Sequence, residues 1–110
     1  MKREEKLEAL RNKIQGETYQ RMVKAGADLG ISPDRVMELH GKAAIETRVI
    51  PGKKYTKIDV GTSGKFMIDA EGNIFGIKGY GVIHRGHRYG TLDTIDEWYW
   101  GEYSPVKVKE

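Results

Sequence analysis

The chain has 110 residues and a formal net charge of +3, from 19 basic and 16 acidic side chains. This length suits one domain, and the small charge excess permits nucleic-acid binding without requiring it. The absence of cysteine excludes a disulfide framework and a thiolate metal site. No apolar run approaches the roughly 18 residues of a membrane span, and residues 1–10 are charged rather than apolar. We therefore expect a cytoplasmic protein without a signal peptide or a membrane helix.

Apolar residues recur at helical spacing between residues 2 and 29. The spacing predicts one long helix or two shorter ones, because Gly16 is a weak point that costs about 1 kcal/mol relative to alanine. Gly30 is expected to end this helix. Ser32 and Pro33 are residue types preferred at the N-cap and at the first position of a following helix.

This second helix is predicted from Pro33 to about Ile45, with Val36 and Leu39 facing inward. With the connection before it, it resembles the helix-turn-helix pattern of DNA-binding proteins over residues 26–39. The matching positions are Gly26, Leu29, Gly30, Ile31, Ser32 and Val36. In that motif a small packing residue and a tight turn let two helices cross closely. The resemblance implies DNA binding, whereas the acidic side chains of the second helix favour an ordinary pair of packed helices.

The second half of the chain has a different composition, since residues 51–110 contain 10 of the 14 glycines and 9 of the 10 aromatic side chains. Residues 47–57 mark the exit from helix, and residues 55–60 alternate as a strand does. Residues 65–78 are predicted to form a hairpin, with Gly72 in the left-handed position of its turn. Glycines in the second strand of this hairpin indicate a bulge or a tight bend.

Two segments are less well defined, because residues 82–95 match no element and residues 97–103 fit either a final strand or a capping loop. The predicted fold class is α+β: two or three N-terminal helices packed on a small curved antiparallel β-sheet, or on a partly open barrel. We expect a single domain, 1–110, with a helical part at 1–46 and a β-rich part at 53–104.

The segment from His84 to Tyr89 is the strongest candidate ligand site, because it combines two histidines, two arginines and a tyrosine. Arginine binds phosphate bidentately, and tyrosine stacks on nucleic-acid bases. A solvated polar loop is the alternative, and a metal site would need Asp93 or Asp96 beside the histidines. The residues predicted to bind nucleic acid or a phosphate-bearing ligand are Lys53, Lys54, Lys57, Lys65, Lys78, Arg85, His87, Arg88 and Tyr89.

Residues 61–65 are superficially similar to a phosphate-binding loop. However, Asp59 stands where the first glycine of that loop belongs, and Phe66 replaces the Ser or Thr that would hold magnesium. We expect a connection between strands, with an anion-binding nest of backbone amides as the alternative.

Residues 93–103 combine acidic side chains with a dense aromatic cluster. If Trp98 and Trp100 lie on a strand, they share one face and are expected to close the core. The alternative is a protein interface, because tryptophan and tyrosine dominate binding hot spots. The residues of that interface would be Asp96, Glu97, Trp98, Trp100, Glu102 and Tyr103.

The sequence gives little support for catalysis, since no nucleophile pairs with a histidine in a recognisable order. We expect a non-enzymatic protein with no metal and no other cofactor. The sequence permits a homodimer.

Much of the second half is similar to small proteins encoded by bacteriophages, plasmids and related mobile elements. The similar segments are residues 54–65, 76–81 and 84–94. The resemblance implies a setting and two competing functions. One is the binding of nucleic acid or a phosphate-bearing ligand through the basic and aromatic residues. The other is an anti-defence inhibitor that blocks a host protein through the acidic and aromatic surface.

Overall fold

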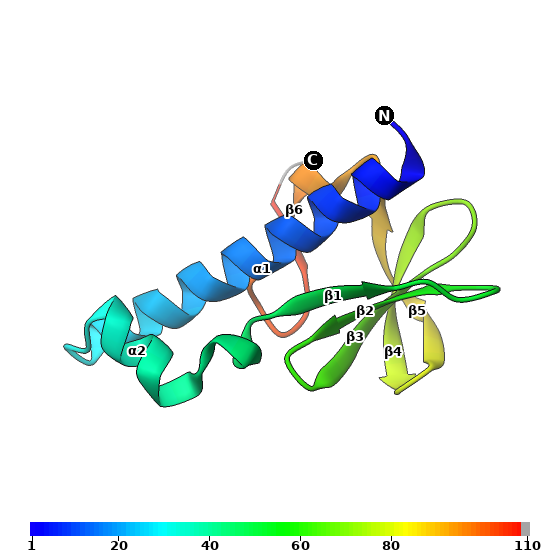
Figure 1. Ribbon diagram of the computed structural model, residues 1–110. Helices are drawn as coiled ribbons and strands as arrows, with labels where there is room; N and C mark the ends of the chain where they lie inside the picture. Colours follow the sequence, from blue (N-terminus) through cyan, green and yellow to red (C-terminus); the bar gives the residue numbers. More distant parts are fainter. Residues whose placement is uncertain (109–110) are drawn as a thin grey trace.

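The computed structural model describes residues 1–108 and has an α+β fold (Figure 1). A long helix, α1, runs across one face of a five-stranded antiparallel sheet and extends past the edge of this sheet, where a short helix, α2, packs against it. A separate two-stranded sheet lies near the C-terminus. None of the helices in residues 1–108 has the length and apolar character needed to cross a bilayer.

The first predicted helix is a single element, α1 (Arg3–Asp28), which continues through Gly16. Gly30 follows it with φ of +75°, the left-handed conformation expected of a residue that ends a helix. The next helix, α2 (Pro33–His40), begins as predicted, because the Ser32 hydroxyl accepts a hydrogen bond from the Arg35 amide at 3.2 Å.

The predicted end of this second helix was wrong. The α2 helix stops at His40 rather than near Ile45, and a 3₁₀ turn, η1 (Lys42–Ala44), follows. Gly41 adopts φ of +80°, which breaks the helical path. With only two turns available, Val36 is buried against α1, whereas Leu39 is 56% exposed and does not face inward. A Cβ atom at Gly26 would collide with Val36 Cγ2, so the small residue is required where the two helices cross.

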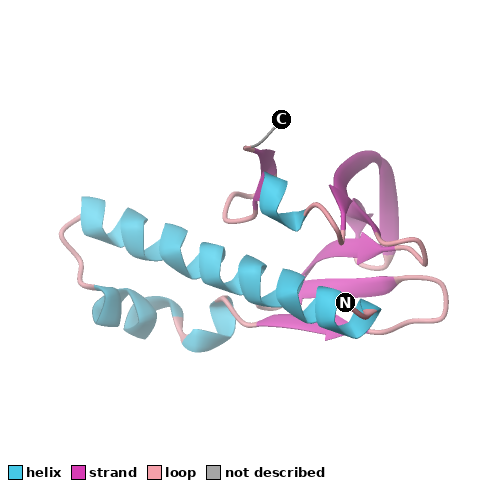
Figure 2. Cartoon of the chain, turned by 90° about the horizontal axis from the view of Figure 1, so that it is seen from above, coloured by secondary structure: helices cyan, strands magenta, loops and turns pink. Residues whose placement is uncertain are grey.

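The main sheet is a meander of neighbouring strands in chain order (Figure 2). Its strands are β1 (Thr47–Ile50), β2 (Thr56–Val60), β3 (Ser63–Ile68), β4 (Asn73–Gly79) and β5 (Val82–Thr91). The β3–β4 hairpin was predicted, and Gly72 in its turn has φ of +88°. Strand β1 lies in the segment that the sequence assigned to the exit from helix. The sheet does not close into a barrel, since β1 and β5 pair only with β2 and β4, respectively.

Strand β5 contains the basic segment that the sequence suggested to be a loop. Its pairing with β4 is irregular, because Gly76 pairs with His84 whereas the preceding residue, Phe75, pairs with Arg88. Three residues of β5, 85–87, therefore bulge out between these two pairs. Side chains of a regular strand alternate between the two faces, and this bulge instead brings His84 and His87, which are three residues apart, to the same side.

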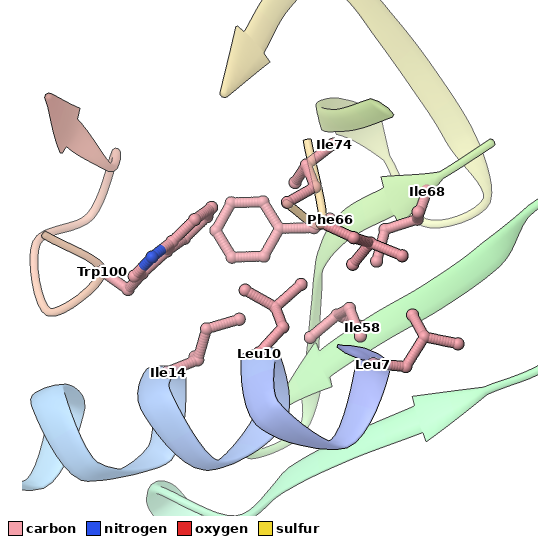
Figure 3. Close-up of a cluster of buried hydrophobic side chains, with 9 residues drawn as sticks. Leu7, Leu10, Ile14, Ile58, Phe66, Ile68, Ile74 and Trp100 are labelled. Atoms are coloured by element: carbon pink, nitrogen blue, oxygen red, sulfur yellow. The ribbon is translucent and has the colours of Figure 1, made fainter. Parts of the chain in front are cut away.

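The hydrophobic core lies between α1 and the sheet face that it covers (Figure 3). It consists of Leu7, Leu10, Ile14, Ile58, Phe66, Ile68, Ile74, Leu92 and Trp100. Trp100 is fully buried, its ring meets the Phe66 ring edge-on at 5.5 Å, and its indole N–H donates to the Ile95 carbonyl at 3.0 Å. The prediction that a tryptophan closes the core is confirmed.

The C-terminal segment that carries Trp100 is attached to α1. It contains a 3₁₀ turn, η2 (Ile95–Glu97), and two short strands, β6 (Trp98–Tyr99) and β7 (Val106–Lys107). Three ion pairs join it to the helix: Lys6–Asp93 at 2.7 Å, Lys13–Asp96 at 3.5 Å and Arg21–Glu102 at 3.2 Å. Acidic side chains of this segment are therefore matched by cations of α1.

Candidate functional site

A cavity of about 810 Å³ lies next to the core residue Phe66, beside strands β4 and β5. Its walls come from the β2–β3 turn and the first residues of β3, from β4 and β5, and from residues 103–105 of the C-terminal segment. Phe66 belongs both to the core and to the cavity wall, so the packed core borders the cavity. The lining residues are Val60, Thr62, Ser63, Gly64, Lys65, Phe66, Gly76, Ile77, Lys78, Gly79, Tyr80, His84, His87, Tyr89, Tyr103, Ser104 and Pro105.

The polar part of this lining is basic or neutral. Within residues 1–108, no aspartate or glutamate lines the cavity, although the chain has 16 acidic residues. Two lysines, Lys65 and Lys78, and two histidines, His84 and His87, do line it. A cavity with this composition favours an anion.

Lys65 lies between the cavity and the C-terminal segment. Its ammonium group donates to the Glu102 carbonyl oxygen at 3.3 Å and lies 5.7 Å from the centre of the Phe66 ring. Burial lowers the pKa of Lys65, and the nearby positive charge of Arg21 lowers it further. Among the described residues no carboxylate forms an ion pair with it. A bound anion would supply the missing countercharge.

The two histidines form a pair at the β4–β5 wall. Their ring centres are 3.9 Å apart, because the bulge in β5 brings residues 84 and 87 together. Burial lowers the pKa of His84 below its ordinary value, and the neighbouring His87 and Lys78 lower it further. An anion in the cavity would oppose this effect by stabilising the protonated ring.

Aromatic rings connect this wall to the core. Tyr89 lies 6.4 Å from His87, 5.9 Å from Phe66 and 5.8 Å from Trp98, measured between ring centres. Gly76 lies beneath, and a Cβ atom there would approach the Tyr89 ring to 3.3 Å. The absence of a side chain at residue 76 thus lets Tyr89 lie close to the strand as an aromatic wall.

Tyr80 lies at the boundary between the cavity and the sheet face opposite α1. It is 60% exposed, and its hydroxyl donates to Asp59 Oδ2 at 3.1 Å, which raises the pKa of Tyr80. The Lys57 ammonium lies 4.8 Å from the centre of the Tyr80 ring. The ring also packs against Gly64, where any Cβ atom would lie 2.6 Å from Tyr80 Cδ1. Asp59 and Lys57 therefore hold an exposed aromatic ring at the cavity rim.

Arg85 and Arg88 lie on the sheet face opposite α1, and Lys54 lies in the connection between β1 and β2. The Arg85 guanidinium lies between two rings, 5.8 Å from the Tyr55 centre and 5.6 Å from the Phe75 centre, and it donates to the Tyr55 hydroxyl. Arg88 donates to Asn73 Oδ1 from two nitrogens, at 2.8 and 3.2 Å. The Lys54 ammonium lies 5.6 Å from the Tyr55 ring centre.

The nine predicted ligand residues thus divide into two groups. Four of them line the cavity: Lys65, Lys78, His87 and Tyr89. The other five, Lys53, Lys54, Lys57, Arg85 and Arg88, lie outside it, on the opposite face or in the β1–β2 connection. The cavity residues absent from the predicted set include His84, Tyr80 and Tyr103. Sequence spacing gave no sign of the bulge that pairs the histidines, or of the C-terminal segment folding back to the cavity.

The structure also places the other motifs. Residues 61–65 form the turn and the start of β3, as expected of a connection between strands. Within residues 1–108, no group of three histidine, aspartate or glutamate side chains could hold a metal ion. Of the alternative protein interface, Trp100 is in the core, Asp96 and Glu102 form ion pairs with α1, and Tyr103 is 90% exposed.

Comparison with protein-family models, with curated proteins and with solved structures found no match.

Proposed function

We propose that the protein is a non-enzymatic binder of a ligand that carries both a phosphate and a base, namely a nucleotide or a segment of single-stranded nucleic acid. The observation that carries this proposal is the cavity, which has lysines and histidines in its lining but no acidic residue among the residues described. Lys65 strengthens it, because a partly buried ammonium without a carboxylate partner is stabilised by a bound anion.

Each part of the cavity has a role in this proposal. Lys78, His84 and His87 surround the phosphate from the β4–β5 side, and Lys65 approaches it from β3. The exposed ring of Tyr80 and the ring of Tyr89 offer flat surfaces for a base, a contact that contributes about 1–3 kcal/mol per base.

The experiment is fluorescence anisotropy with 5′-labelled oligothymidylate at 50 and 200 mM salt. We expect Lys78→Ala to weaken binding about tenfold at the lower salt, and to reduce the slope of log affinity against log salt by about 0.7. The matched control is Lys24→Ala, which removes the same charge from an exposed position on α1, away from the cavity. Equal losses in the two variants, or wild-type binding weaker than about 0.1 mM at the lower salt, would contradict the proposal.

A further inference from the structure

We infer that the ligand is a single-stranded polynucleotide that leaves the cavity past Tyr80 and continues along the sheet face opposite α1. This inference depends on the proposed function and specifies its ligand as a strand several nucleotides long. It assigns a second, separate contact region to Lys57 and Arg85, which do not line the cavity.

The distribution of ion pairs supports this path. On the α1 side, Lys6, Lys13 and Arg21 pair with carboxylates of the C-terminal segment. On the opposite face, neither Lys57 nor Arg85 forms an ion pair within 4.0 Å with a carboxylate of the described residues, although hydrogen bonds from Asn73 and Glu71, together with the Arg85 charge, lower the pKa of Asp69. Cations without an ion-pair partner can contact phosphates and release the counterions that are condensed on the polynucleotide, and this release contributes much of the affinity.

The acidic residue that β2 places on this face does not cancel that charge. The Asp59 side chain is only 8% exposed, and its Oδ2 atom accepts the Tyr80 hydroxyl and lies 3.9 Å from Arg48 Nη2. A phosphate that approaches the surface therefore meets the ammonium of Lys57 and the guanidinium of Arg85 rather than this carboxylate.

Aromatic rings lie between these cations, which is the arrangement that binds single strands. Tyr80 lies under Lys57, and Tyr55 lies beside Arg85. The Arg85 guanidinium uses one nitrogen on the Tyr55 hydroxyl, so other N–H groups are available for phosphate oxygens. Stacking on the exposed face of such rings is tolerant of sequence but requires bases that are not paired in a duplex.

The cavity and this face are continuous at two places. Tyr80 lines the cavity and also contacts Lys57 and Asp59 of the opposite face. In the β5 bulge, Arg85 contacts Phe75 on that face, whereas His84 and His87 on either side of it line the cavity. One strand that passes the β4–β5 end of the sheet can therefore contact both regions, with a footprint of roughly 4 or more nucleotides.

The test is a length series of labelled oligothymidylates with 1, 4, 8 and 12 nucleotides at low salt. We expect the affinity to rise at least tenfold between the mononucleotide and the octamer. Arg85→Ala should weaken the octamer about tenfold and leave the mononucleotide unchanged, whereas Lys78→Ala should weaken both. Arg85 is exposed, and a thermal melt checks that the variant folds. Lys57→Gln should likewise weaken the octamer, and the comparison with the mononucleotide is made with Arg85→Ala because Lys57 also contacts the Tyr80 ring of the cavity.

Several outcomes would overturn the inference. If the mononucleotide binds and the affinity does not increase with oligonucleotide length, the proposed function stands but the second contact region is excluded. Duplex DNA bound as tightly as the single strand, or polyglutamate bound with the same dependence on Arg85, would show a general polyanion surface instead. Absence of binding to every oligonucleotide would defeat both the inference and the proposed function.

Discussion

The two sides of the sheet differ in how their charges are balanced. On the side of α1, cations of the helix face carboxylates of the C-terminal segment, and the three ion pairs join parts of the chain that are far apart in the sequence. Around the cavity and on the opposite face, Lys57, Lys65, Arg85 and Arg88 contact aromatic rings, a carbonyl and an amide instead, whereas Arg48 on β1 lies near Asp59. The net charge of +3 therefore understates the basic character of one side. The first side is therefore expected to determine stability and the second to determine binding.

The largest effect on stability is expected from a substitution in the hydrophobic core. Trp100→Ala removes a fully buried indole that contacts Phe66, and should lower the free energy of unfolding by about 3–5 kcal/mol. Urea denaturation followed by circular dichroism measures this loss. Tyr103→Ala is the control, because an exposed ring of this kind should change stability by less than about 0.5 kcal/mol. A Trp100→Ala protein as stable as wild type would contradict the assignment of this residue to the core.

The crossing of α1 and α2 is expected to affect stability and not ligand binding. Gly26→Ala forces a Cβ atom against Val36 and should cost about 1–3 kcal/mol, with no change in oligonucleotide affinity. Gly16→Ala is the matched variant in the same helix, where nothing lies within 4 Å, and it should stabilise by up to about 1 kcal/mol. Thermal melts of both variants give the comparison. A loss of duplex DNA binding in Gly26→Ala, at unchanged stability, would instead support the helix-turn-helix interpretation.

The binding side should respond to pH through His84. In the free protein its pKa is lowered by burial, by His87 and by Lys78, and a phosphodiester beside the ring raises it. The complex therefore binds more protons than the free protein. As the pH falls through the pKa of His84 in the complex, the affinity should rise by less than tenfold per pH unit. It should level off below the pKa of His84 in the free protein.

Oligothymidylate suits this measurement, because its phosphodiesters and bases keep their charge between pH 5 and 8. Anisotropy titrations across that range should show the increase in wild type and a smaller one in His84→Gln. An identical pH profile in the two proteins would exclude His84 as the titrating contact.

The smallest effect is expected for the ion pairs on the α1 side. Lys6 and Asp93 are 2.7 Å apart, but both side chains are partly in water, so their interaction should contribute only about 0.2–1 kcal/mol. A double-mutant cycle with Lys6→Ala and Asp93→Ala measures this coupling, which should fade in 1 M salt. Neither variant should alter the affinity for oligothymidylate. A clear loss of binding would show that this side also contacts the ligand.

Local signals in the sequence were enough to predict the elements that depend on neighbouring residues. Ser32 and Pro33 marked the start of α2, Gly30 marked the end of α1, and Gly72 marked the β3–β4 turn. Each of these acts through its own backbone conformation or through a neighbour three residues away. The α+β class was predicted from the change of composition between the two halves of the chain, and the burial of a tryptophan from its large apolar ring.

Only the tertiary structure decided which of the predicted ligand residues meet. The segment from His84 to Tyr89 was a single basic cluster in the sequence, but the bulge of β5 against Gly76 sends His87 and Tyr89 to the cavity and Arg85 to the opposite face. The position of Tyr103 at the cavity depends on a C-terminal segment anchored by Trp100 and by contacts with α1. Strand pairing and burial between distant segments set these positions, and neither is encoded in the spacing of neighbouring residues.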